Sequence, residues 1–224
     1  MQFKMVGVKG GTFQMGSTDG EEDEQPVHTV SLSSYWIGET EVTQALWAAV
    51  MGETASATTA QRPQCEKTWE EVQEFLEKLS EKTGLKFRLP TEAEWEFAAR
   101  GGTKSKNYMF SGSNVIGDVA WYEDNSGYVK DFSSYSHDVA TKTSNELGIY
   151  DMSGNVYEFC QDWYGPYGSA SQVNPTGPDT GTDRAVRGGY HTSPPKGCRT
   201  TMRYKISPTG SHQQTGFRLA RSMN

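Results

Sequence analysis

Hydrophobic and polar residues alternate over the first forty positions of the chain. Three short stretches, at 12–15, 29–32 and 35–38, follow this alternation, which is the period of a β-strand with one buried face. We therefore predict β-strands within residues 11–42. The acidic stretch 19–24 separates two of them and is expected to be a solvated loop, with a cation site as the less favoured alternative.

The spacing of apolar residues then changes to that of helices. A threonine followed three residues later by a glutamate is a capping box, and this pattern occurs after residues 67 and 90. Glycine is a common helix terminator. We therefore predict three helices, which begin after Thr43, Thr68 and Thr91 and end at Gly52, Gly84 and Gly101. The middle helix carries one apolar stripe, formed by Trp69, Val72, Phe75, Leu76 and Leu79.

The second half of the chain is less regular. Residues 103–183 show little periodicity beyond short turns, and loops this long in a compact domain are usually functional or hold an ion. The strand pattern returns over 184–187, 198–203 and 215–221. Short strands, a few helices and long loops predict an α+β fold. No stretch resembles an interdomain linker, so we expect a single domain over residues 1–224.

Composition excludes several classes of function. The net charge is −7 and no basic run is present, which argues against a nucleic-acid groove. No window reaches the roughly 18 apolar residues of a membrane span, and the first residues lack the apolar core of a signal peptide. A cytoplasmic protein and a trimmed surface or secreted protein both remain open. The cysteines at 65, 160 and 198 form no CxxC pair, so neither a disulfide framework nor a zinc site is indicated.

Four motifs point to a known family. Residues 145–158 read NELGIYDMSGNVYE, residues 10–16 read GGTFQMG, residues 87–102 read FRLPTEAEWEFAARGG, and RGG at 187–189 precedes GFRL at 216–219. In this order they resemble the formylglycine-generating enzyme (sulfatase-modifying factor) family, along nearly the whole chain. The resemblance implies a C-type-lectin-like fold of the formylglycine-generating-enzyme type, loop-rich and low in regular structure.

The 145–158 motif suggests a calcium site. Asp151 and Glu158 bracket a run of small residues, and calcium prefers carboxylate and backbone carbonyl oxygens. In the family this loop holds calcium, and the matching ligands are the side chains of Asp151 and Glu158 with the carbonyls of Gly154 and Val156. The alternative is a structural turn in which Glu158 pairs with an arginine.

The segment after RGG bears on catalysis. Active members of the family carry two cysteines five residues apart here, which bind copper(I) and oxidise a substrate cysteine to formylglycine. In this chain Cys198 is the second, but Ser193 stands in the first position, and a hydroxyl cannot replace a thiolate on copper(I). We therefore expect no copper and a non-catalytic protein, with Cys198 as a buried structural thiol. The alternative is a sulfatase-modifying oxidase in which Cys198 is catalytic. A metal site of His191, His212 and Cys198 is less favoured, since their spacing is not that of ligands.

The C-terminal segment, about 190–214, has the composition of a recognition surface. Such a mix of tyrosine, serine, histidine and glutamine is typical of adaptable binding loops. The segment also resembles the one that is diversified in the variable proteins of diversity-generating retroelements. We expect a ligand-binding or scaffold domain that presents this surface to a protein or glycan; the alternative is ordinary loop residues with no partner. The candidate ligand-binding residues are Tyr190, His191, Thr192, Ser193, Lys196, Tyr204, Lys205, Ile206, Thr209, Ser211, His212, Gln213 and Gln214.

Overall fold

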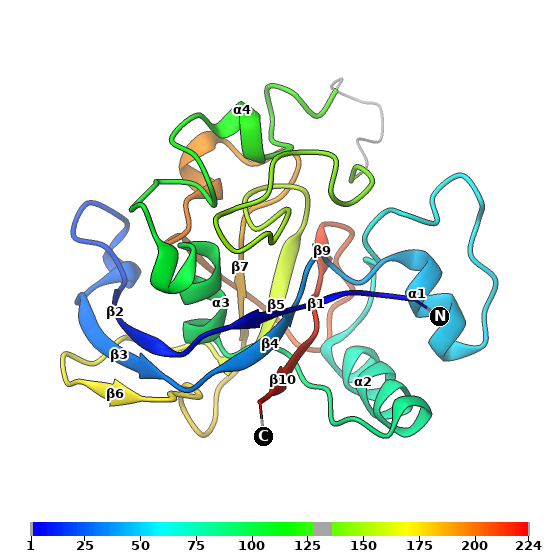
Figure 1. Cartoon of the computed structure of the whole chain (residues 1–224), viewed down its shortest axis with the longest axis horizontal. Helices are drawn as coiled ribbons and strands as arrows, with labels where there is room; N and C mark the ends of the chain where they lie inside the picture. The colour runs from blue at the N-terminus through cyan, green and yellow to red at the C-terminus, as the bar shows by residue number, and fades with distance from the viewer. Residues whose placement is uncertain (1, 128–135, 224) are drawn as a thin grey trace.

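Two small sheets are built mainly from the first forty residues. The computed structural model describes residues 2–127 and 136–223. One sheet contains, in spatial order, the antiparallel strands β1 (Met5–Val8), β4 (Tyr35–Gly38) and β10 (Ala220–Ser222). The other contains β2 (Gly11–Met15), β3 (His28–Leu32) and β6 (Gln172–Val173). β1 and β10, which come from the two ends of the chain, therefore pair with opposite edges of β4 (Figure 1).

A third sheet runs through the middle of the molecule (Figure 1). Its strands, in spatial order, are β8 (Arg203–Ile206), β7 (Arg184–Arg187), β5 (Tyr157–Trp163) and β9 (Thr215–Gly216). Side chains alternate between the faces of a strand. Accordingly Val186 joins an apolar cluster with α1 and α2 on one face, whereas its neighbour Arg187 pairs with Glu96 of α3 on the other.

The three predicted helices are present. They are α1 (Gln44–Met51), α2 (Trp69–Thr83) and α3 (Glu92–Ala99), and each predicted threonine cap accepts a backbone N–H at 3.2 Å. α3 ends at Ala99 instead of Gly101, because Gly101 adopts a positive φ of 88° and starts a 3₁₀ turn. The shorter elements are α4 (Ile116–Val119) and the 3₁₀ helices η1 (Glu22–Glu24), η2 (Gly102–Lys104) and η3 (Pro195–Cys198).

Several expected strands are corrected by the structure. β5 lies inside the region predicted to lack periodicity, because this central strand buries Glu158 and Asp162 and its pattern does not alternate. The strand expected at 198–203 is replaced by the end of η3 and a turn, and β8 begins only at Arg203. The strand expected at 215–221 is two short strands, since β9 pairs with β5 and β10 pairs with β4.

The acidic stretch 19–24 is only partly the solvated loop that was expected. Its last residue, Glu24, has no exposed surface and forms an ion pair of 2.6 Å with Arg199. Arg199 and the preceding short helix η3 are therefore tied to the N-terminal region.

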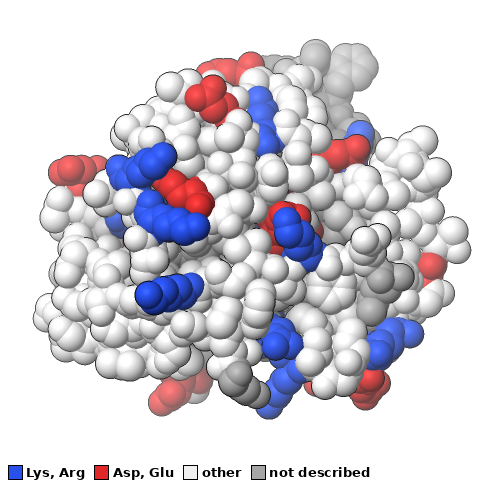
Figure 2. All heavy atoms as spheres, in the orientation of Figure 1, with Lys and Arg blue, Asp and Glu red and all other residues white. Residues whose placement is uncertain are grey.

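Charged side chains on the face drawn in Figure 2 form no continuous basic stripe. On the face in Figure 2, basic and acidic side chains are dispersed among uncharged ones. Within residues 2–127 and 136–223, no helix is long and apolar enough to cross a bilayer.

Buried ion pairs join α3 to the central sheet. Glu92 contacts Arg203 through both oxygens, at 2.7 and 2.9 Å. One turn later, Glu96 pairs with Arg187, and neither side chain has exposed surface. Each arginine lies on the face of β7 or β8 that is turned toward α3. The glutamates of the FRLPTEAEWEFAAR motif and the arginine of the RGG motif thus form one buried charge network.

We expect Glu96→Ala to lower the free energy of unfolding by about 3–5 kcal/mol, because it leaves Arg187 buried without its main partner. Urea unfolding monitored by tryptophan fluorescence measures this loss. The control is Glu74→Ala, which removes an exposed ion pair with Lys78 on α2 and should cost less than about 0.5 kcal/mol. Equal losses in the two variants would contradict the role given to the buried network.

Candidate functional site

Three tyrosine rings form a continuous surface on one face of the central sheet. The Tyr157 ring lies 5.0 Å from that of Tyr190 and stacks on that of Tyr204 at 5.2 Å between centroids. Tyr204 is 48% exposed. We call these three residues the tyrosine ladder. Tyr190 and Tyr204 were predicted as ligand-binding residues, whereas Tyr157 was missed because it stands in the 145–158 motif, which was interpreted as an ion-binding loop.

The predicted loop 207–214 adjoins the ladder. The carbonyl of Gln214 accepts the backbone N–H of Tyr157 at 2.8 Å, and the carbonyl of Pro208 accepts that of Trp69 at 3.1 Å. The loop is therefore attached to both β5 and the start of α2. Its outward residues include Thr209, Ser211 and Gln213, with His212 and Gln214 half-buried. Rigid elements thus carry an irregular, polar loop, which is the usual construction of a binding surface.

Three of the predicted ligand-binding residues are buried and cannot face a ligand. His191 is 5% exposed, and its Nδ1 lies 3.0 Å from the carbonyl of Asn155. The hydroxyl of Ser193 accepts the backbone N–H of Tyr190 at 3.0 Å. Ile206 belongs to the core beside α1 and α2. All three support the surface from beneath.

Two further predicted residues lie away from the ladder. Lys205 follows Tyr204 on β8 and so points to the opposite face, where its Nζ lies 5.4 Å from the Tyr164 ring. Lys196 is exposed on η3. Thr192, half-buried, stays next to Tyr190 in the turn after β7. The binding role of the 190–214 segment stays a prediction, and alternation along β8 divides its residues between two faces.

The 145–158 loop is organised around an arginine. Both oxygens of Glu158 accept hydrogen bonds from Arg218 at 2.5 Å, and one also accepts from Trp95 Nε1 at 2.8 Å. Gly154, whose carbonyl was a predicted ligand, donates its N–H to Gly188 at 2.8 Å. Glu158 therefore pairs with an arginine, as the structural-turn alternative to a calcium site predicts.

Two of the four predicted calcium donors have other partners in the structure. Asp151 accepts the Ala140 N–H at 2.7 Å, Val156 is buried at the start of β5, and the cation beside Glu158 is the guanidinium of Arg218. Among the described residues, no group of three or more His, Cys, Asp or Glu side chains could hold a metal ion. Calcium binding by this loop remains a prediction.

A pair of buried carboxyl groups lies beside this arginine. Asp151 and Glu41 are 4% and 2% exposed. One oxygen of Glu41 accepts a hydrogen bond from Asn155 at 3.0 Å, and its other oxygen, Oε2, has no hydrogen-bond partner among the described residues. Burial raises the pKa of Asp151 to about 6, against the opposing effects of the Ala140 N–H and Arg218. Burial also raises the pKa of Glu41, helped by the charges of Asp151 and Glu158. Both shifts favour the protonated form of these carboxyl groups.

We expect this carboxyl pair to make the protein less stable as the pH rises. The folded pKa of Asp151, about 6, lies above the unfolded value of 3.8, so the folded state holds the proton more tightly. The stability from this proton is complete below about pH 4 and is lost as the pH passes through about 6. Asp151→Asn keeps a neutral side chain suited to its positive φ of 60°. It should raise the free energy of unfolding at pH 7.5 by about 1–3 kcal/mol and flatten its pH dependence.

Thermal unfolding with and without EDTA separates this account from calcium binding. A calcium site would make the wild-type melting temperature fall with EDTA, and Asp151→Asn would then destabilise the protein and remove that sensitivity. Stabilisation by Asp151→Asn together with an unchanged wild-type melting curve would leave the raised pKa of Asp151 as the explanation.

Known proteins resemble the chain over its full length. The family described as "Sulfatase-modifying factor enzyme 1-like domain" matches residues 1–223. The "Chaperone protein LppX" of Paenibacillus barcinonensis is 31% identical over 97% of this chain and 89% of its own length. The formylglycine-generating enzyme of Streptomyces coelicolor is 28% identical over 96% of this chain and 88% of its own. The serine/threonine-protein kinase pkn1 of Chlamydia pneumoniae is 30% identical, but the match covers only 38% of that protein.

Solved structures also resemble the chain over nearly its full length. Variable protein 1 of Treponema denticola superposes with a TM-score of 0.90 and 34% identity, over 100% of this chain and 96% of that one. PvdO from Pseudomonas aeruginosa superposes with a TM-score of 0.78 at 24% identity, over 98% of this chain and 94% of its own, and shows the fold alone. The predicted loop-rich α+β fold is thereby confirmed, and the chain belongs to the family of sulfatase-modifying factor enzyme 1-like (formylglycine-generating enzyme) domains.

Proposed function

We propose that this chain is a non-catalytic binding domain that presents the tyrosine ladder and the 207–214 loop to a protein or glycan ligand. The ladder is the observation that carries the proposal. Tyrosine rings offer a large contact area with little side-chain entropy to lose, and their hydroxyls supply hydrogen bonds. Three such rings from separate segments lie in contact and partly exposed beside a rigid sheet, an arrangement that suits recognition better than core packing.

The likeness to Treponema denticola variable protein 1 supports a binding role. Its name describes a variable protein, and it matches the whole of this chain. We extend the proposal to a diversified receptor, in which the codons of exposed residues such as Tyr204 and Gln213 vary while the buried His191, Ser193 and Ile206 support the surface. A neighbouring reverse transcriptase gene with a near-copy of the segment coding for residues 187–221 would support this extension, and its absence would contradict it.

The environment of Cys198 argues against the alternative, a sulfatase-modifying oxidase. Cys198 has no exposed surface and packs with Phe110 and Val119. Burial, followed by the charge of Glu123, raises its pKa to about 12, so the thiolate that copper(I) needs is disfavoured. Its family partner position holds Ser193, whose hydroxyl is used in the turn to Tyr190.

We expect Tyr204→Ala to weaken ligand binding at least about tenfold without changing the melting temperature, because an exposed aromatic contact is lost from the centre of the surface. Glycan and extracellular-protein arrays probed with the wild type identify ligands, and titration by interferometry gives the affinities. Tyr108→Ala, which truncates a half-buried tyrosine outside the ladder, is the matched control. Ligands whose affinity is the same for wild type and both variants would contradict the assignment of this surface.

For the thiol, we expect Cys198→Ala to cost on the order of 1 kcal/mol of stability and to leave ligand binding unchanged, since a small buried group is lost. The native protein should also react slowly with a thiol reagent. Incubation with copper(I), oxygen and a Cys-x-Pro-x-Arg peptide tests the oxidase directly. Formation of the aldehyde at an enzymatic rate by the wild type, and not by Cys198→Ala, would refute the non-catalytic assignment.

A further inference from the structure

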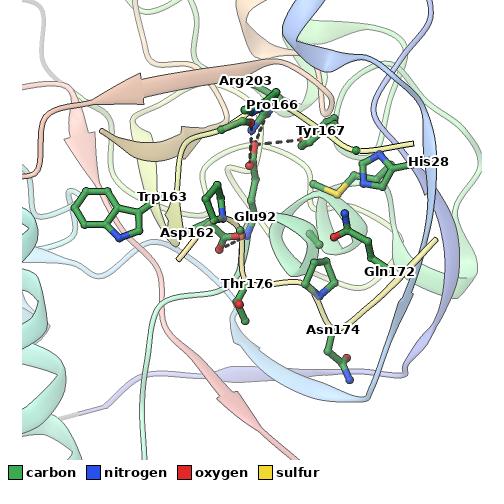
Figure 3. Close-up of a pocket in the computed structure, with 17 residues that line it drawn as sticks. His28, Glu92, Asp162, Trp163, Pro166, Tyr167, Gln172, Asn174, Thr176 and Arg203 are labelled. Atoms are coloured by element: carbon green, nitrogen blue, oxygen red, sulfur yellow. Dashed lines mark hydrogen bonds and ion pairs between the residues drawn. The ribbon is translucent and has the colours of Figure 1, made fainter. Parts of the chain in front are cut away.

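A pocket of about 430 Å³ opens on the face of the central sheet opposite the tyrosine ladder. Its walls come from β2 and β3, the first turn of α3, the end of β5, the segment 165–178 and Arg203 of β8. Arg203 and Tyr204 are neighbours on β8, so alternation along the strand separates the two sites. In Figure 3 the side chains of Glu92, Tyr167, His28 and Gln172 are arranged around one central space.

Three polar side chains in this pocket retain unused hydrogen-bonding atoms. Asp162 is 4% exposed; its Oδ2 accepts the Glu92 N–H at 2.9 Å, and its Oδ1 has no partner among the described residues. His28 is also 4% exposed, and its Nδ1 lies 3.0 Å from the Pro26 carbonyl. Nδ1 must therefore be the donor in that contact, which leaves Nε2 as a free acceptor in neutral histidine. The amide of Gln172 likewise makes no hydrogen bond within the described part of the chain.

The charges around the pocket are already paired. Both oxygens of Glu92 are bound by Arg203. Two of its three other N–H donors are used by the carbonyls of Asp23 at 2.8 Å and Gly165 at 3.0 Å. Its guanidinium stacks 3.8 Å from the Tyr167 ring centroid. No free cation among the described lining residues is left for a phosphate, sulfate or carboxylate, so the pocket suits an uncharged ligand.

Asp162 is itself a neutral acid in these surroundings. Burial raises its pKa to about 8, and the charges of Glu92 and Glu94 act in the same direction. The Glu92 N–H and the charge of Arg203 oppose this rise in the pKa of Asp162. Arg184 is a second cation that interacts with the charge of Asp162. At neutral pH the carboxyl group can both donate and accept a hydrogen bond, as a ligand hydroxyl can.

We propose that this pocket binds a small, uncharged polyhydroxyl ligand of one or two sugar rings. Free donors and acceptors on Asp162, His28 and Gln172 match hydroxyl groups, and the Tyr167 ring with prolines at 166, 175 and 178 supplies the apolar wall that sugar C–H groups need. The volume lies within the range of small-molecule sites. This site is separate from the tyrosine ladder, so either assignment can fail without the other.

Ligand-observed NMR and calorimetry with glucose, galactose, N-acetylglucosamine, maltose and cellobiose test the proposal at pH 6.5. We expect at least one of these sugars to bind with a dissociation constant of about 1 mM or tighter. Gln172→Ala should weaken that binding about tenfold, since it removes a hydrogen-bonding group from a half-exposed position. Gln61→Ala, an exposed glutamine outside the pocket, is the matched control and should have no effect.

The charge state of Asp162 gives a second readout. Wild-type affinity should fall as the pH rises past about 8, because the carboxyl group then ionises and loses its donor. Asp162→Asn keeps an acceptor for the Glu92 N–H and a neutral donor, so its binding should persist at pH 9.5. Melting curves of every variant establish that it is folded.

Three outcomes would overturn the proposal. They are failure of all five sugars to bind the folded wild type, equal affinities of Gln172→Ala and Gln61→Ala, and preferential binding of butylamine with an affinity that rises above pH 8. The last would identify a site for organic cations, in which an ionised Asp162 is the counter-charge.

Discussion

The buried ion pairs between α3 and the central sheet are the constraint on which the rest of the structure depends. A buried charge is costly unless it is paired and hydrogen-bonded. Glu92 and Glu96 therefore require Arg203 and Arg187 at fixed positions on β8 and β7. These pairs join a helix near residue 95 to strands near residues 185 and 205. They hold together a chain whose loops supply little regular hydrogen bonding.

The same pairs decide which side chains remain for function. Since β8 directs Arg203 toward α3, its neighbour Tyr204 must point to the other face. Tyr204 thereby reaches Tyr157 and Tyr190, whereas Arg203 closes the back of the pocket beside Asp162. One strand thus contributes to two sites that differ in chemistry. The ladder is aromatic and partly exposed, whereas the pocket is a hollow whose polar lining includes the buried Asp162 and His28.

The two positions that carry cysteines in active family members have a hydrogen-bond partner or packing partners in this chain. Ser193 holds the turn that presents Tyr190, and Cys198 fills a small apolar cluster. In the 145–158 loop, Arg218 pairs with Glu158, and burial raises the pKa of Asp151. Each of these buried side chains has a packing, hydrogen-bonding or charged partner, so the family fold is preserved. A fold can be kept in this way while its surface changes, because function resides in sites that the fold carries.

Local signals in the sequence determined the three capped helices, the early strands and the family, because capping boxes, alternation and short motifs depend on residues close together in the chain. Tertiary structure decided the rest. β5 was not predicted because its buried acids are neutralised by distant arginines and helix N–H groups. The division of 190–214 into buried residues, ladder residues and residues on the opposite face depended on where β8 begins. Tyr157 became part of the ladder, and Asp162 part of the pocket, only through partners brought from elsewhere in the chain. Pairwise contacts across such separations leave no periodic trace in one sequence, which is why the fold could be predicted and the arrangement of its sites could not.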